Sequence, residues 1–229
     1  METLAAELTS VSVVYPQPSG EVRALDDVTI GFPKASSTAI VGRSGSGKST
    51  LISVLALLRS PSAGSVRIAG VETGRLSASA RARLRSTEVG IVFQAFHLEQ
   101  SLSATENVML PWYVRKGGET GRVARARAAE LLGLLGIGHL GESHPNQLSG
   151  GQRQRVAIDR ALFTEPTLFI ADEPTGNLDE ETANEVADLI LSLPPTLRTA
   201  VVLVTHDGAV AERSDRRFRL TRGHLSPAS

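Results

Sequence analysis

The chain has 229 residues, 41% of them hydrophobic, with 24 basic and 24 acidic side chains and no cysteine. This length and composition suit one large globular domain or two small ones, and the lack of cysteine excludes disulfides, thiolate metal sites and thiol nucleophiles. The net charge of zero argues against nucleic acid as a partner, and no apolar run approaches the roughly 20 residues that span a bilayer. Since no secretory signal is visible, we expect a soluble, cytoplasmic protein.

The sequence predicts two kinds of strand. Residues 8–32 alternate β-branched runs with a turn rich in Pro, Gly and Ser, which is typical of an antiparallel hairpin or small sheet, and residues 64–70 are similar. Continuous Val- and Ile-rich runs, in contrast, suit strands buried on both faces of a parallel sheet. Those runs are residues 37–42, 89–94, 166–172 and 199–206.

Helical stretches separate the buried strands. They follow Gly47, Gly121, Gly150 and Asp179, so strand and helix alternate and the predicted fold class is α/β. Residues from about 95 to 155 contain no clear buried strand, and we expect them to form a helical subdomain inserted in the core.

A phosphate-binding loop is the strongest motif. "GRSGSGKS", from Gly42 to Ser49, matches G-x-x-x-x-G-K-[ST], follows an apolar strand and opens an apolar helix. Glycines let successive backbone N–H groups point at phosphate oxygens, and the helix N-terminus adds partial positive charge. Lys48 is expected to reach the β- and γ-phosphates, and the Ser49 hydroxyl to ligate Mg²⁺.

Two carboxylates end a later buried strand. In "TLFIADE", Asp172 is expected to hold Mg²⁺, directly or through water, and Glu173 to orient the attacking water or accept its proton. The alternative is an acidic loop or helix cap. Together with the phosphate loop, these residues predict a nucleoside-triphosphate hydrolase.

A second possible anion cradle lies in "HPNQLSGGQRQR", residues 144–155, where Ser149, Gly150 and Gly151 open a charged helix. Taken alone, such a turn is most often a helix N-cap. In combination with the other motifs, the sequence resembles the ATP-binding cassette (ABC) ATPases, whose hallmark "LSGGQ" lies between the phosphate loop and the "ADE" carboxylates. The resemblance covers almost the whole chain and implies a P-loop NTPase core with an N-terminal antiparallel β subdomain and a helical signature subdomain, as a single domain over residues 1–229.

The resemblance implies roles for further residues. Gln94 is similar to the glutamine that senses Mg²⁺ and the γ-phosphate, and His206 to the histidine that touches the γ-phosphate. Asp179 in "GNLD" is similar to the aspartate that contacts the opposite cassette, and Tyr15 to the aromatic residue that stacks on adenine. Taken singly, Gln94 and His206 could be structural strand-end residues, Asp179 a helix cap and Tyr15 a core aromatic.

The expected site residues form three groups. The catalytic residues are Lys48, Gln94, Glu173 and His206. The expected metal ligands are Ser49, Gln94 and Asp172. The ATP-binding residues are Tyr15, Gly42, Ser44, Gly45, Ser46, Gly47, Lys48, Ser49 and Thr50 from one copy, with Ser149, Gly150, Gly151, Gln152 and Asp179 from the other.

The resemblance also implies partners. ABC cassettes pair head to tail, each closing its signature loop over the ATP of the other, and act with an integral membrane permease, which places them on the cytoplasmic face of the membrane. Residues 93–111, "HPNQLSGGQRQRVAI" and "ADEPTGNLD" resemble the subgroup of lipoprotein release, macrolide export and cell division. The alternatives are a soluble cassette ATPase acting on DNA or ribosomes, and a cassette that gates a partner without transporting a substrate.

Some stretches depart from the family pattern. Ser36 and Ser37 replace a glycine-containing turn, and Asp159 stands where a small residue is usual and is expected to pair with Arg155 or Arg160 on the surface. The segment after Pro111 carries the only tryptophan and is a candidate for partner recognition. The basic run "RSDRRFRLTRG" is interpreted as an edge strand with a solvated face.

Overall fold

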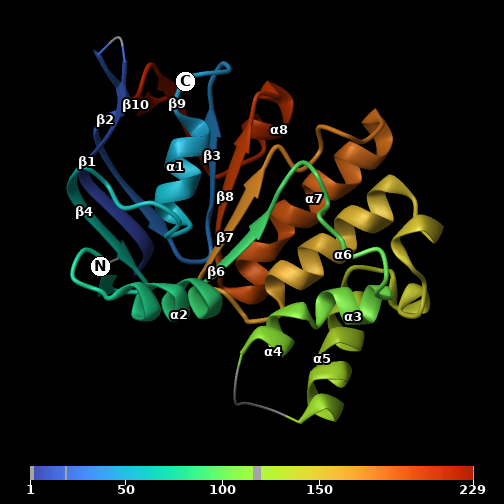
Figure 1. Ribbon diagram of the computed structural model, residues 1–229. Helices are drawn as coiled ribbons and strands as arrows, with labels where there is room; N and C mark the ends of the chain where they lie inside the picture. The colour runs from blue at the N-terminus through green and yellow to red at the C-terminus, as the bar shows by residue number, and fades with distance from the viewer. Residues whose placement is uncertain (1–2, 19, 116–119, 229) are drawn as a thin grey trace.

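The computed structural model describes residues 3–18, 20–115 and 120–228. A central sheet stands between an antiparallel sheet on one side and a group of helices on the other (Figure 1). Part of the segment after Pro111, residues 116–119, lies outside the described residues.

The central sheet has six strands in the order β10-β9-β3-β8-β7-β6. All neighbours pair in parallel except β10, which runs antiparallel to β9. The strands are β3 (Ser37–Val41), β6 (Val89–Val92), β7 (Leu168–Asp172), β8 (Ala200–Thr205), β9 (Arg216–Thr221) and β10 (His224–Pro227). Because β3, β7 and β8 are buried on both faces, their sequences are continuous apolar runs rather than alternating ones.

The prediction of an edge strand in the basic C-terminal run is wrong. β9 pairs with β3 on one side and with β10 on the other, so β10 is the edge. Leu220 of β9 is fully buried and Phe218 packs against the core, while Arg216 donates a hydrogen bond to the Gly31 carbonyl at 2.7 Å. Arg216 and Arg217 are half-buried, whereas Arg219 is exposed, so this face of the strand is only partly solvated.

The antiparallel sheet has the order β2-β1-β4-β5. Its strands are β1 (Leu4–Gln17), β2 (Gly20–Pro33), β4 (Ala63–Ile68) and β5 (Val71–Glu72). Leu8, Val11 and Val13 of β1 are fully buried against the central sheet and α1 (Lys48–Leu55). The predicted hairpin and the short strand near residue 64 are thus one sheet that covers the core.

Helices fill the region between β6 and β7. Within the described residues from 95 to 155 the chain forms helices and turns but no strand. These are α3 (Ala104–Val108), α4 (Leu110–Val114), α5 (Gly121–Leu134), the 3₁₀ turns Gly138–Leu140 and Pro145–Gln147, and the start of α6 (Gly150–Leu162). The remaining helices are α2 (Ala78–Glu88), α7 (Glu180–Leu197) and α8 (Gly208–Glu212).

The expected surface pairing of Asp159 is also wrong. α6 packs against α3, α5, α7 and β6, so the side chain of Asp159 is fully buried. Arg155 instead donates to the Leu135 carbonyl and to Glu185, and Arg160 donates to the carbonyls of Phe96 and His97. Burial raises the pKa of Asp159 to about 8, which keeps the carboxyl largely protonated at neutral pH.

The parallel topology determines where functional side chains can meet. The carboxyl ends of β3, β6, β7 and β8 lie at the same edge of the central sheet, and the motif loops follow directly from them. In open α/β sheets this edge is where ligands bind. Among the helices that the structure describes, none combines the length and apolar character that a membrane crossing requires.

Candidate functional site

The loop from Gly42 to Ser49 wraps the N-terminus of α1, and its glycines are required by geometry. Gly45 and Gly47 have φ angles of 75° and 110°, which residues with a side chain rarely adopt. A Cβ on Gly47 would lie 2.3 Å from the Ala24 carbonyl oxygen, and one on Gly42 would lie 2.6 Å from the Leu220 carbonyl oxygen. Neither position can therefore carry a side chain without moving the backbone around it.

A cavity of about 520 Å³ opens beside this loop. It collects side chains from the ends of four parallel strands and from the start of α1. Its lining is Ala24, Arg43, Ser44, Gly45, Gly47, Lys48, Ser49, Thr50, Gln94, Asp172, Glu173 and His206. The catalytic and metal residues expected from the sequence thus face one cavity, although they span residues 48 to 206.

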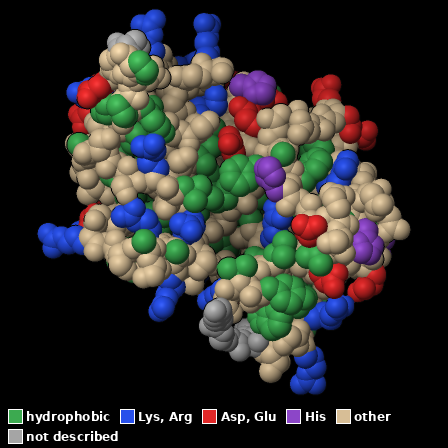
Figure 2. Space-filling model, in the orientation of Figure 1, with side chains coloured by type: hydrophobic (Ala, Val, Ile, Leu, Met, Phe, Trp, Pro, Cys, Tyr) green, Lys and Arg blue, Asp and Glu red, His purple; other side chains and the backbone are tan. Residues whose placement is uncertain are grey.

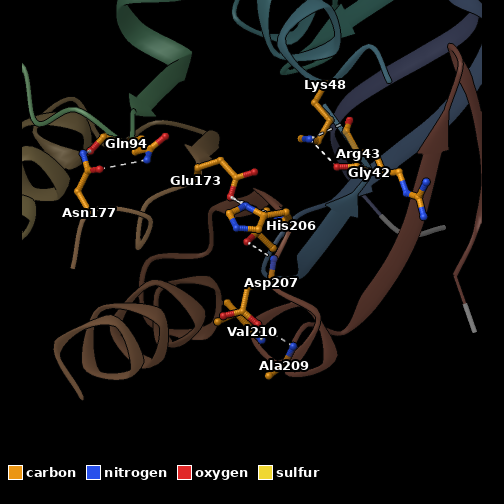
Figure 3. Close-up of polar contacts among 11 residues, drawn as sticks. Gly42, Arg43, Lys48, Gln94, Glu173, Asn177, His206, Asp207, Ala209 and Val210 are labelled. Atoms are coloured by element: carbon orange, nitrogen blue, oxygen red, sulfur yellow. Dashed lines mark hydrogen bonds and ion pairs between the residues drawn. The ribbon is translucent and has the colours of Figure 1, made fainter. Parts of the chain in front are cut away.

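Lys48 points back over the loop, as Figure 3 shows. Its Nζ donates to the Gly42 carbonyl at 2.6 Å and to the Arg43 carbonyl at 3.3 Å. These are neutral acceptors, and an anionic phosphate oxygen is a stronger partner for an ammonium group. Lys48 is therefore held in the cavity by two backbone carbonyls, near the Asp172 carboxylate.

Asp172 ends β7 and is half-buried. Burial, together with the charge of Glu173, raises the pKa of Asp172, while the nearby Lys48 ammonium lowers it. A bound divalent cation would favour the ionised carboxylate.

Glu173 and His206 are in direct contact (Figure 3). Glu173 has a left-handed φ of 47°, and its N–H donates to the Val204 carbonyl at 2.8 Å. The Glu173 Oε2 atom accepts from the His206 N–H at 3.2 Å and lies 2.8 Å from His206 Nδ1. Asp207 caps α8 by accepting from the N–H groups of Ala209 and Val210, which fixes the backbone next to His206. Glu173, the predicted base, and His206, the predicted γ-phosphate contact, are therefore hydrogen-bonded to each other.

Gln94 is tied to a residue that sequence reasoning missed. Its Nε2 donates to Asn177 Oδ1 at 3.1 Å, and Asn177 Nδ2 donates to the Gln94 carbonyl at 3.0 Å (Figure 3). A Cβ on Gly176 would lie 2.8 Å from Gln94 Nε2, so the glycine leaves room for this amide pair. Only the position of Asn177 inside the "GNLD" motif, two residues before Asp179, could have suggested its role.

The donor set suits a hard cation. Ser49, Gln94 and Asp172 offer a hydroxyl, an amide and a carboxylate oxygen to the same cavity, and Mg²⁺ prefers oxygen ligands, usually one or two carboxylates plus water and phosphate. In the described part of the chain no three His, Cys, Asp or Glu side chains cluster as a metal cage. The residues present thus fit a magnesium ion.

Three predicted nucleotide-binding residues lie next to the cavity without being in its lining. Tyr15 is half-buried, and its hydroxyl lies 3.3 Å from Thr50 Oγ1. Gly42 contributes the carbonyl that holds Lys48. Ser46 is buried, its N–H donates to the Arg43 carbonyl at 3.2 Å, and its carbonyl accepts from Gly223. The backbone of Ser46 therefore helps to hold the loop in its conformation.

The signature residues lie outside the lining of this cavity. Ser149 caps α6, with its hydroxyl accepting from the Gln152 N–H and its N–H donating to Gln152 Oε1 at 2.8 Å. A Cβ on Gly151 would lie 2.4 Å from Thr182 Cγ2. The helix-cap interpretation of the serine is thus correct within the chain, and contact of these residues with the nucleotide of a second copy stays a prediction.

Asp179 is the N-cap of α7. It accepts a hydrogen bond from the Thr182 N–H at 3.0 Å, which is the main reason that its pKa lies below the usual range. The capping alternative is again correct, and contact with a second copy stays a prediction.

The family model described as "ABC transporter" matches residues 25–176 of this sequence, which includes the phosphate loop, Gln94, the signature and both carboxylates. The chain belongs to the ABC transporter family. The expected resemblance is confirmed, and so are the predicted fold class and the prediction of an ATP-binding and ATP-hydrolysing subunit.

Relatives within the ABC family are similar in sequence to this chain over nearly its full length. The lipoprotein-releasing system ATP-binding protein LolD of Colwellia psychrerythraea is 43% identical over 219 residues, which cover 96% of this chain and 84% of the relative. LolD of Bordetella pertussis is 43% identical over 223 residues, which cover 97% and 96%. The predicted subgroup of lipoprotein release is therefore well represented among the relatives.

Solved ABC cassettes share the fold. A dimeric post-hydrolysis state of the cassette MJ0796, bound to ADP and Pi, superposes with a TM-score of 0.85 at 35% identity and covers 97% of this chain and 98% of that one. The structure of cbiO1 from Clostridium perfringens, part of the ABC transporter complex cbiONQ, has a TM-score of 0.87 at 28% identity and covers 98% and 88%.

Proposed function

We propose that this chain hydrolyses ATP at the cavity beside Lys48 and thereby drives a separate membrane subunit of a lipoprotein-release type of system. The observation that carries the proposal is the convergence of the phosphate loop, Gln94, Asp172, Glu173 and His206 on one cavity of about 520 Å³. The name of the LolD relatives supports the lipoprotein-release assignment.

Each side chain has a role in this proposal. The loop N–H groups and Lys48 bind the β- and γ-phosphates, and Ser49, Gln94 and Asp172 hold Mg²⁺. The bound ion supplies charge neutralisation for the transferring phosphoryl group. The hydrogen bond to Asn177 uses Gln94 Nε2, so Gln94 Oε1 would be the atom that ligates the ion, and Asn177 would orient the amide for it.

Glu173 accepts the proton of the attacking water. Its Oε2 already accepts from His206, but a carboxylate has about four lone-pair sites and can bond a water at the same time. His206 holds the base in position through its backbone N–H and Nδ1, and in the protonated ring the other nitrogen can donate to the γ-phosphate.

The site becomes complete in a head-to-tail dimer. We infer that Ser149, Gly150, Gly151, Gln152 and Asp179 of one copy close over the ATP of the other. Support comes from their position outside the lining of the cavity in their own chain and from the dimeric form of the related cassette MJ0796. Closure excludes water and completes the catalytic set.

A membrane subunit fits the surface of the helical region, which we take as a subdomain of about residues 95–155 within a single domain of residues 1–229. Tyr113 and Val114 of α4 are 54% and 76% exposed, and hydrophobic side chains gather beside the helices at lower right in Figure 2. Exposed apolar surface of this kind marks interaction sites. We therefore place the chain on the cytoplasmic face of a membrane, with no nucleic acid partner.

Affinity purification tests the proposal. Glu173→Gln protein is isolated from membranes of its source cell with ATP present, and Glu181→Gln, an exposed position in the first turn of α7, is the matched control. We expect Glu173→Gln to retain a few-span membrane protein with a large extracytoplasmic domain. A many-span permease would overturn the lipoprotein-release assignment, and recovery of only soluble chains, ribosomes or DNA would contradict a membrane role.

A further inference from the structure

The ring of Tyr15 is covered on one face by an arginine. The guanidinium carbon of Arg59 lies 4.1 Å from the centroid of the Tyr15 ring, well within the distance of about 6 Å at which a cation is attracted to the face of an aromatic ring. No motif in the sequence points to this contact, because the two residues are far apart in the chain.

The backbone holds Arg59 at this place. The Arg59 N–H donates to the Ser53 carbonyl at 3.0 Å at the end of α1. Ser62, just beyond, is fastened to β1, because its Oγ accepts from the Val14 N–H and its N–H donates to the Ser12 carbonyl. The segment that carries Arg59 is thus anchored to α1 on one side and to β1, the strand that carries Tyr15, on the other.

Arg59 has no competing carboxylate in the described part of the chain. Six other arginines form ion pairs with Asp or Glu, whereas no ion pair involves Arg59. A cavity of about 150 Å³ beside it is lined by Arg59, Arg81 and uncharged residues only. The Tyr15 ring is therefore the main electrostatic partner of this guanidinium.

Tyr15 is fixed at a second point by the nucleotide site. Its hydroxyl lies 3.3 Å from Thr50 Oγ1, and Thr50 lines the ATP cavity. With one face against Arg59 and the hydroxyl close to Thr50 Oγ1, the ring is held at two points. A ring ordered in advance loses less entropy when a ligand stacks on it.

We propose that Arg59 is a positioning residue for the nucleotide base: it backs the Tyr15 ring so that the opposite face stacks on adenine. The inference rests on the proposed ATPase function and deepens it by assigning part of the base recognition to a residue outside the motifs. Arg59 acts through Tyr15 and touches no reacting atom, so it contributes to the affinity for ATP and not to the chemical step.

Steady-state kinetics test this inference. We expect Arg59→Met to raise the KM for ATP roughly three- to tenfold with kcat unchanged, and Arg59→Lys to recover part of the loss because the cation is kept. Inorganic tripolyphosphate with Mg²⁺ serves as a competitive inhibitor without a base, and its Ki should not change. Arg83→Met, on the exposed face of α2, is the control for the loss of one arginine charge.

The same variants on a Tyr15→Leu background complete the test. Arg59→Met should have no further effect there, since its action requires the ring. An unchanged or lower KM in Arg59→Met, or an equal loss for tripolyphosphate, would overturn the inference. If Tyr15→Leu alone leaves the KM unchanged, base stacking is wrong and the inference fails while the ATPase stands. If the wild-type protein does not hydrolyse ATP, the proposed function itself fails.

Discussion

Asp159 makes the stability of this protein depend on pH in an unusual direction. Its side chain is fully buried in α6, both carboxylate oxygens lack a hydrogen-bond partner within the described residues, and burial raises its pKa to about 8. In the unfolded chain an aspartate titrates near pH 4. Between these values the native state holds a proton that the unfolded state has lost.

The sign and size follow from that difference. Because the native state binds about one more proton, the free energy of unfolding falls by about 1.4 kcal/mol for each pH unit between pH 4 and pH 8. The contribution is fully present below pH 4 and is lost as the pH rises toward the native pKa. From pH 5 to pH 8 the loss from Asp159 amounts to about 4 kcal/mol.

Replacing Asp159 with Asn removes the ionisation and keeps the shape. Between pH 5 and pH 8 the free energy of unfolding of Asp159→Asn should fall by about 4 kcal/mol less than that of the wild type. Urea unfolding followed by circular dichroism at each pH measures this difference. Asp27→Asn, at an exposed position, should follow the wild-type slope. A slope of Asp159→Asn equal to that of the wild type would show that Asp159 is not buried as a neutral carboxyl, and the reasoning would be refuted.

Three further changes test the site. Gly47→Ala should abolish ATP binding, because its Cβ would meet the Ala24 carbonyl at 2.3 Å; equilibrium binding of ATP checks this, and wild-type affinity would contradict it. Asn177→Ala should raise the concentration of Mg²⁺ needed for half-maximal hydrolysis by roughly two- to fivefold, since the hydrogen bond that orients the Gln94 amide is lost; an unchanged or lowered requirement would be evidence against Asn177 as a positioning residue. His206→Ala should lower kcat by roughly 10²-fold while ATP still binds, and near-normal turnover would remove His206 from its role.

Much of the fold could be predicted because its causes are local or periodic. Strands buried on both faces, such as β7 and β8, must be continuous apolar runs, and the phosphate loop needs glycines at particular φ angles. The convergence of Lys48, Asp172 and His206 follows from parallel strands whose carboxyl ends share an edge.

The features that the sequence did not predict depend on packing between distant segments of the chain. Asp159 looked like a surface residue because neighbouring arginines stand beside it in sequence, yet α6 is enclosed by three helices and a strand. Asn177 pairs with Gln94 across 83 positions, and Arg59 meets Tyr15 only after α1 is folded against β1. Such contacts are set by the tertiary structure and leave no pattern in the sequence.

The central claim is that two copies of the chain hydrolyse ATP at shared sites, with Glu173 as the general base. The most direct test measures the oligomeric state and the ATP turnover of Glu173→Gln, with Glu181→Gln as the control. In light scattering with Mg²⁺ and ATP, Glu173→Gln should be a stable dimer that dissociates when the nucleotide is removed. Its ATP turnover should be reduced by roughly 10²-fold or more, whereas Glu181→Gln should hydrolyse ATP at the wild-type rate. A Glu173→Gln protein that stays monomeric with bound ATP, or that hydrolyses ATP at a near-normal rate, would contradict the account.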